Sequence, residues 1–123
     1  MKSQDRNVVR MRHMLDAATK AVSFVADKSR NDLDTDEMLA LALVRPIEII
    51  GEAASKVSAE TQNRSPMIEW RDIIGTRNRL IHAYEAVNFD ILWQIASVDL
   101  PQLIPKLQQA IDDESKGDQG KLF

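Results

Sequence analysis

Residues 70–84 read WRDIIGTRNRLIHAY, and the fold of the chain is organised around this stretch. The apolar pair Ile73-Ile74 recurs seven residues later as Leu80-Ile81, and Trp70 precedes the first pair by about one helical turn. This spacing predicts an amphipathic helix whose apolar stripe faces a core. The same stretch holds the polar side chains that are best suited to binding or catalysis in this chain: Arg77, Asn78, Arg79, His82 and Tyr84.

Helical geometry limits what these polar residues can do on their own. Arg77 and His82 are five residues apart, which at roughly 100° per residue places them about 140° apart around a helix. Arg77 and Tyr84 are seven residues apart and lie near one face if the helix persists that far. Since one helix cannot direct Arg77 and His82 at the same ligand, we expect a cleft with a second wall.

Length and composition exclude several classes of protein. A chain of 123 residues is one domain with a real core but little room for a deep pocket, so a site shared between two copies is plausible. Cysteine is absent, which excludes disulfides and thiolate zinc sites, and two histidines are too few for a histidine-rich metal cage. The N-terminal residues lack a signal-peptide core, and the longest apolar run, residues 38–44, is far below the ~20 residues of a membrane span. We therefore expect a cytoplasmic protein that does not enter the membrane.

Charge is unevenly distributed along this acidic chain. The net charge is −3, yet residues 1–30 carry seven basic and three acidic side chains, and residues 31–60 carry two and seven. Overall acidity argues weakly against nucleic-acid binding, while Arg71, Arg77 and Arg79 favour a local positive field beside the polar motif. Arg10, Arg12 and His13 could line a phosphate path, but a solvated outer helix face is the preferred interpretation for them.

The rest of the chain predicts further helices. Apolar spacings of three and four indicate a first helix over 5–28 and a second over 36–56, with Pro46 inside the second. Gly51, Ala53 and Ala54 offer a surface with little bulk against which another helix can pack closely. Ser65-Pro66 is typical of the start of the motif helix.

A fourth helix is expected to begin near Phe89 with Asn88 as its cap, and Pro101 to break or bend it before a further segment that ends at 111. No stretch alternates with the period of a strand. The sequence therefore predicts an all-α bundle of four main helices in residues 1–111, followed by a mobile tail over 112–123.

Residues 77–84 fit the pattern Arg-x4-His-x-Tyr, and with the blocks GEAA at 51–54 and WRDIIG at 70–75 the chain resembles HEPN-domain proteins. It is most similar to the HepT-type toxins of HEPN/MNT toxin–antitoxin systems, over roughly residues 5–110. Pro46 and Glu85-Ala86 depart from the family pattern, but neither affects Arg77, His82 or Tyr84.

The resemblance implies a symmetric homodimer, HEPN-like in fold, that is a metal-independent endoribonuclease without a cofactor. Arg77 and His82 would be the catalytic pair with Asn78 as their polar neighbour, and Arg79 is assigned to binding of the RNA substrate. Tyr84 would receive AMP from a partner nucleotidyltransferase, the MNT-type antitoxin.

The chemistry of these residue types is compatible with that activity. His82 titrates near neutrality and can act as base or acid, and the permanently charged fork of Arg77 matches phosphate oxygens. Two alternatives remain open: a catalytically silent helical module that binds a nucleotidyltransferase, and an accessory domain that holds a substrate or nucleotide for that partner.

Overall fold

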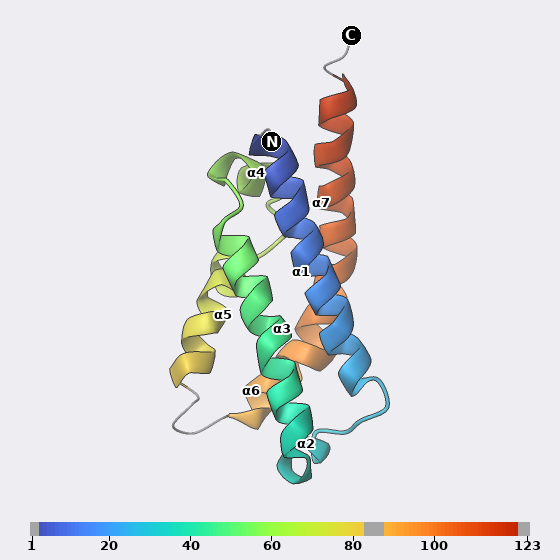
Figure 1. Ribbon diagram of the computed structural model, residues 1–123, viewed down its shortest axis with the longest axis vertical. Coiled ribbons are helices and arrows are strands. Elements are labelled where there is room, and N and C mark those ends of the chain that lie inside the picture. The colour runs from blue at the N-terminus through green and yellow to red at the C-terminus, as the bar shows by residue number, and fades with distance from the viewer. Residues whose placement is uncertain (1–2, 83–87, 121–123) are drawn as a thin grey trace.

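The computed structural model describes residues 3–82 and 88–120, and they form an all-α structure of packed helices (Figure 1). Helix α1 (Ser3–Val25) packs against α3 (Glu37–Ser55) on one side and α7 (Leu100–Gly120) on the other. Helix α5 (Trp70–His82) packs on the side of α3 away from α1. In the described part of the chain, no helix is both long and apolar enough to cross a bilayer.

Helix α3 is central to the bundle because both α1 and α5 pack on it. Its Asp36 cap accepts a hydrogen bond from the Leu39 amide at 3.1 Å, and the helix continues through Pro46. Gly51, Ala53 and Ala54 are all buried within the chain. The close packing expected at these small residues is therefore made by helices of the same chain.

The motif helix starts later than the sequence predicted. Helix α5 begins at Trp70 rather than at Ser65-Pro66. The Ser65 carbonyl accepts hydrogen bonds from the Ile68 amide at 3.2 Å and from the Trp70 indole at 3.0 Å. Residues 65–69 therefore form a turn, and the buried Trp70 ring fixes where the helix enters the bundle.

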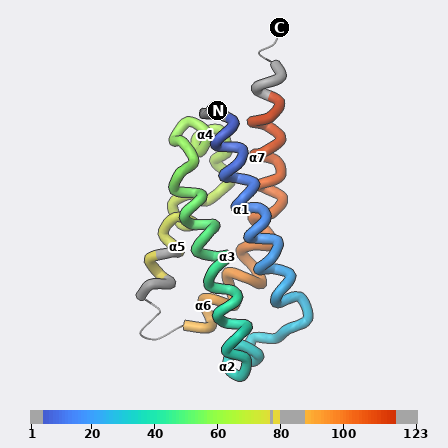
Figure 2. The backbone as a smooth tube through the Cα atoms, viewed as in Figure 1, coloured from blue at the N-terminus to red at the C-terminus, as the bar shows by residue number. Residues whose placement is uncertain are grey.

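The last part of the chain is one continuous helical run from residue 89 to 120. Asn88 caps α6 (Phe89–Gln94) as predicted, because its Oδ1 accepts from the amides of Asp90 and Ile91 at 3.0 and 3.3 Å. Pro101 does not end the helix. A π-helical turn, η1 (Ile95–Asp99), joins α6 to α7, and the tube in Figure 2 follows this path without a loop. The wider turn accommodates the missing proline N–H.

Helix α7 also extends beyond the predicted domain end at 111. The sequence loses its apolar period there, yet the helix continues to Gly120. The expected mobility of residues 112–123 stays a prediction, and residues 121–123 lie outside the described part. The physical reason for the longer helix is Glu114, only 3% exposed, whose carboxylate accepts from Arg64 Nε at 2.7 Å and Nη2 at 3.0 Å. This bidentate ion pair ties α7 to α4 (Ala59–Arg64).

A buried polar network extends this ion pair to α1. Arg64 Nη2 also donates to Thr61 Oγ1 at 3.1 Å, and the Asn7 amide donates to the same hydroxyl at 3.0 Å. Asn7 Oδ1 in turn accepts from the backbone amide of Ser58, the cap of α4. One network therefore joins the start of α1, the short helix α4 and the last turns of α7.

We predict that Arg64→Met lowers the free energy of unfolding by about 1–3 kcal/mol, since it removes two donors from a buried carboxylate. Hydrogen bonding to Glu114 raises the pKa of Arg64 in the folded protein. A raised pKa of a basic group stabilises the folded state fully at every pH below the pKa of that group in the unfolded chain. The loss of unfolding free energy in Arg64→Met should therefore be the same from pH 6 to 9. Thermal unfolding followed by circular dichroism measures it. Arg71→Met on the exposed face of α5 is the control, and equal melting temperatures for the two variants would contradict the role of the ion pair.

Candidate functional site

The residues predicted to carry chemistry all map to α5 or to the segment that follows it. Arg77 and His82 both lie within the described helix, as the sequence predicted. Their side chains lie outside the described part of the structure, and so does the whole of Tyr84, within residues 83–87. Asn78 and Arg79 are described, and both are exposed.

Arg79 is held along the surface of α5 by a short chain of hydrogen bonds. Its Nη2 donates to Thr76 Oγ1 at 3.3 Å, and that hydroxyl donates to the Asp72 carbonyl oxygen one turn earlier at 2.8 Å. Thr76 is buried, so the guanidinium of Arg79 is anchored on a fixed residue. An arginine placed in this way still directs its remaining N–H groups outward, where they can meet phosphate oxygens.

A cleft separates α5 from η1 and the start of α7. Its volume is about 120 Å³, and its floor is apolar. The α5 wall carries charged and polar groups at Asp72, Thr76 and Arg79, and at Glu69 just before the helix begins. The opposite wall carries Asp99, Gln102 and Lys106. The lining residue Thr76 is the immediate sequence neighbour of Arg77.

The second wall of this cleft has no signal in the sequence. Asp99 and Lys106 lie 17 and 24 residues after His82, the last residue of α5, and no motif marks them. The α5 wall was detectable, since residues 69, 72, 76 and 79 follow helical spacing. The same chain thus supplies a second wall opposite Thr76 and Arg79, and the wall expected for Arg77 and His82 stays a prediction.

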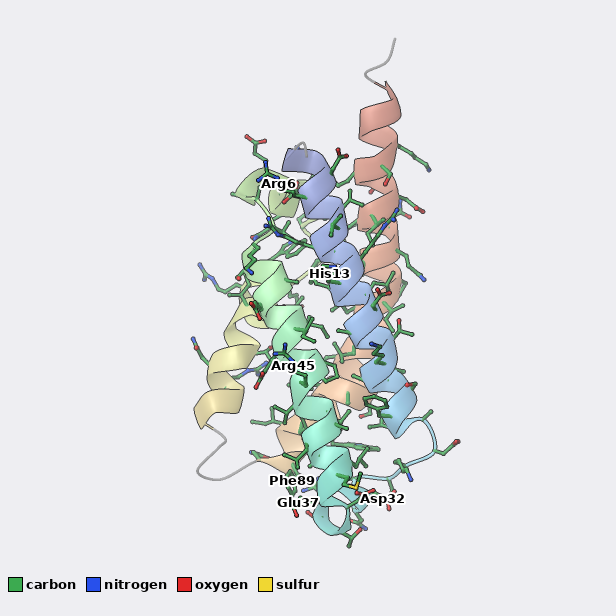
Figure 3. All side chains as sticks on the ribbon, in the orientation of Figure 1. Arg6, His13, Asp32, Glu37, Arg45 and Phe89 are labelled. Carbon is green, nitrogen blue, oxygen red and sulfur yellow. The ribbon has the colours of Figure 1, made fainter. Side chains whose placement is uncertain are left out.

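The chain re-enters the bundle at a well-fixed point after residues 83–87. Arg30 Nε donates to Asp90 Oδ1 at 2.6 Å, its Nη1 donates to Asp34 of α2 (Asp32–Thr35) at 3.2 Å, and its guanidinium lies 5.8 Å from the Phe89 ring centre. Figure 3 shows Phe89 at the end of the bundle where α2 lies. Hydrogen bonding to Asp90 raises the pKa of Arg30, which keeps this cation charged.

The basic residues of α1 do not join this site within one chain. Helix α3 separates α1 from α5, and His13 points to the outer face of the α1–α3 pair (Figure 3). Arg10 donates to the Lys56 carbonyl oxygen at 2.9 Å, and Arg12 is exposed. A groove between α1 and α3 is lined by Arg10, His13 and Lys56, on a different face from the α5 cleft.

Among the described side chains, no three His, Cys, Asp or Glu residues are arranged to hold a metal ion. The carboxylates of α3 are used locally instead: Glu48 pairs with Arg45 at 3.6 Å and Glu52 with Lys56 at 3.5 Å.

Most of this chain is similar in sequence to a family of known proteins. Residues 14–110 match the family described as "Ribonuclease HepT-like". A Methanocaldococcus jannaschii protein named "Putative RNase" is 31% identical over 90 residues, or 73% of this chain and 83% of its own. A second "Putative RNase", from Caldanaerobacter subterraneus subsp. tengcongensis, is 31% identical over 104 residues, or 85% and 93%.

A third relative carries a more specific name. The "Probable ribonuclease HepT" of Thermococcus cleftensis is 30% identical over 99 residues, covering 77% of this chain and 90% of the relative. No solved structure is significantly similar to this one. The matched region contains α3, α5 and the cleft between α5 and α7.

Proposed function

The chain belongs to the HepT-like ribonuclease family, and from this premise we propose that it is the toxin of a toxin–antitoxin pair and cuts RNA without a metal ion. The observation that carries the proposal is that Arg77 and His82 share helix α5, inside the region matched by the family. Asn78 and Arg79 are exposed on the same helix, where a long polyanion can reach them.

The proposed reaction is a transesterification within the RNA. His82 in its neutral form removes the proton from a ribose 2′-hydroxyl, whose oxygen attacks the adjacent phosphorus. The bond to the 5′-oxygen breaks, that oxygen takes a proton from a second, protonated His82 in the proposed dimer, and a 2′,3′-cyclic phosphate remains. Arg77 stabilises the charge on the phosphorane oxygens, and Asn78 and Arg79 hold the phosphate path.

We predict that Arg77→Ala and His82→Ala each lower RNA cleavage by at least a hundredfold, and that each also abolishes growth arrest on expression without a partner. Cleavage by the unchanged chain should survive EDTA and leave a 2′,3′-cyclic phosphate, identified by mass spectrometry of the products.

Matched controls exist for both substitutions. Arg71→Ala changes an exposed arginine on the same helix, and His13→Ala changes the only other histidine, on α1. Both controls should retain cleavage. Full activity in Arg77→Ala or His82→Ala, or a requirement for added Mg²⁺, would refute the proposal in favour of a silent module or a metal-dependent enzyme.

A homodimer is part of the proposal, because Arg77 and His82 are about 140° apart on one helix and cannot converge without a second surface. The outer face of α3 supports this assembly. Met38 and Leu41 are 80% and 60% exposed there, although both are large apolar side chains. A second copy that covers this face would remove them from water and bring two α5 helices toward one cleft.

We predict that Leu41→Glu converts the dimer into a monomer and reduces cleavage, because it places a charge in the proposed apolar interface. Sedimentation velocity at micromolar concentration measures the assembly, and circular dichroism should be unchanged since Leu41 is not in the core. Gln108→Glu on the exposed face of α7 is the control. A monomeric unchanged chain that still cuts RNA would overturn the shared site.

Regulation by a nucleotidyltransferase of the MNT type is the last part of the proposal, with Tyr84 as the acceptor of AMP. Tyr84 is two residues beyond His82, the last residue of α5. An attached nucleotide would add a phosphate charge and bulk beside Arg77, where it competes with the RNA phosphate.

We predict that Tyr84→Phe keeps nuclease activity but escapes neutralisation by the partner and ATP, because it lacks the acceptor oxygen at nearly equal volume. Intact mass after incubation with both should rise by one or more AMP units for the unchanged chain only. An increment that persists in Tyr84→Phe, or none on the unchanged chain, would contradict the assignment.

A further inference from the structure

Two oppositely directed helices form the walls of the cleft beside the motif. Helix α5 runs away from the N-terminal end of the bundle, and α7 runs back toward it (Figures 1 and 2). The residues that line the cleft therefore meet in reverse order. The end of α5, which carries Arg79, is therefore nearer to the turn that carries Asp99, and the start of α5, with Asp72 and the preceding Glu69, is nearer to the part of α7 that carries Lys106.

Both walls of the cleft thus carry charges of both signs, and these charges do not pair with one another across it. Among the described residues, no ion pair within 4.0 Å joins Arg79 to Asp99, or Lys106 to Glu69 or Asp72. Arg79 instead donates to Thr76, and Asp99 accepts a long 3.4 Å hydrogen bond from Gln94. Lys106 is half-buried between the walls.

The floor of the cleft is formed by aliphatic side chains, against which a flat ring can pack. It is made by side chains from α3, α5, η1 and α7: Ile47, Ile50, Ile73, Ile95, Leu100 and Leu103. A volume of about 120 Å³ is far below the several hundred Å³ of an ordinary cofactor pocket. It suits one base inserted edge-first, with its sugar and phosphate left outside.

The charges specify which base fits best. Guanine presents two neighbouring donors, N1–H and the N2 amino group, on its Watson–Crick edge, and two acceptors, O6 and N7, on the other edge. A carboxylate accepts from the first edge, and an arginine or lysine donates to the second. Adenine, cytosine and uracil lack this division into a donor edge and an acceptor edge, so a cleft with both signs of charge favours guanine.

We propose that the α5–α7 cleft, through Asp72, Asp99 and Lys106, binds an unpaired guanine of the RNA and so sets where the chain cuts. This inference rests on the proposed ribonuclease function. Arg79 lines the cleft and is two residues from Arg77, so the phosphate attached to a bound guanine is delivered to the part of α5 that carries the motif.

Binding and cutting are tested separately. First, fluorescence anisotropy compares the full-length His82→Ala chain with labelled oligouridine RNAs that carry one central guanine, adenine or cytosine. The guanine RNA should bind about tenfold more tightly than all-uridine RNA. Asp99→Asn and Lys106→Met should each remove most of that difference, while Asp112→Asn and Lys116→Met, exposed on the same helix, should preserve it.

Second, the unchanged chain is incubated with the same RNAs and the cut positions are mapped. Cuts next to guanine that become scattered in Asp99→Asn support the inference. If RNA is cut without base preference in every variant, the inference is overturned while the ribonuclease function stands.

If nothing is cut but the guanine preference in binding persists, the ribonuclease function fails and the cleft remains a guanine site. Equal affinity for free GMP and for the guanine RNA would overturn the inference in favour of a free-nucleotide site. Equal circular dichroism melting curves for all variants exclude misfolding as a cause.

Discussion

The packing of α5 on α3 is the contact on which the proposed site depends. Ile73 and Trp70 bury the apolar side of α5, and the Trp70 indole is fixed by the Ser65 carbonyl at the point where the helix starts. Because α3 is the main partner of α5, one side of the motif helix is committed to the core. The polar residues on its other sides remain available for RNA, for a second copy or for a modifying enzyme.

Much of the fold was predictable because local chemistry and tertiary packing agree. The stripe of α5, the Asn88 cap and the all-α class followed from periodicity and capping residues alone. The errors arose where a distant partner decided the outcome. Glu114 lies in a stretch without apolar period, and its helix persists because Arg64, fifty residues earlier, pairs with it. Ser65-Pro66 has the residues of a helix start, but the Ser65 carbonyl accepts hydrogen bonds from the Trp70 indole and the Ile68 amide in a turn, and the helix begins only at Trp70.

The candidate site shows the same division. Arg77, His82, Asn78 and Arg79 could be identified from sequence because one helix carries them, and the structure places all four on α5. Asp99 and Lys106 could not, because they reach the cleft only through the antiparallel course of α7. Charges of both signs meet at this cleft because the chain folds back on itself between α5 and α7, and neither segment alone has an unusual composition. The sequence also could not show which apolar residues of α3 are exposed: Leu43 is buried against the other helices, whereas Leu41 faces solvent.

The π-helical turn at Ile95–Asp99 gives this chain a place where its length can change without a change in facing. A π turn holds one residue more than an α turn, and here the Leu100 amide donates to the Ile95 carbonyl across five residues. Deletion of one residue within 95–99 would restore α-helical spacing and leave the rest of α7 facing nearly as before, because the extra residue is the one that the wider turn holds. Deletion of one residue between Lys106 and Glu114 would instead rotate Glu114 by about 100° relative to Lys106 and turn it away from Arg64. Homologues that are one residue shorter in this turn can therefore keep both the cleft and the ion pair, whereas those that are one residue shorter further along α7 cannot.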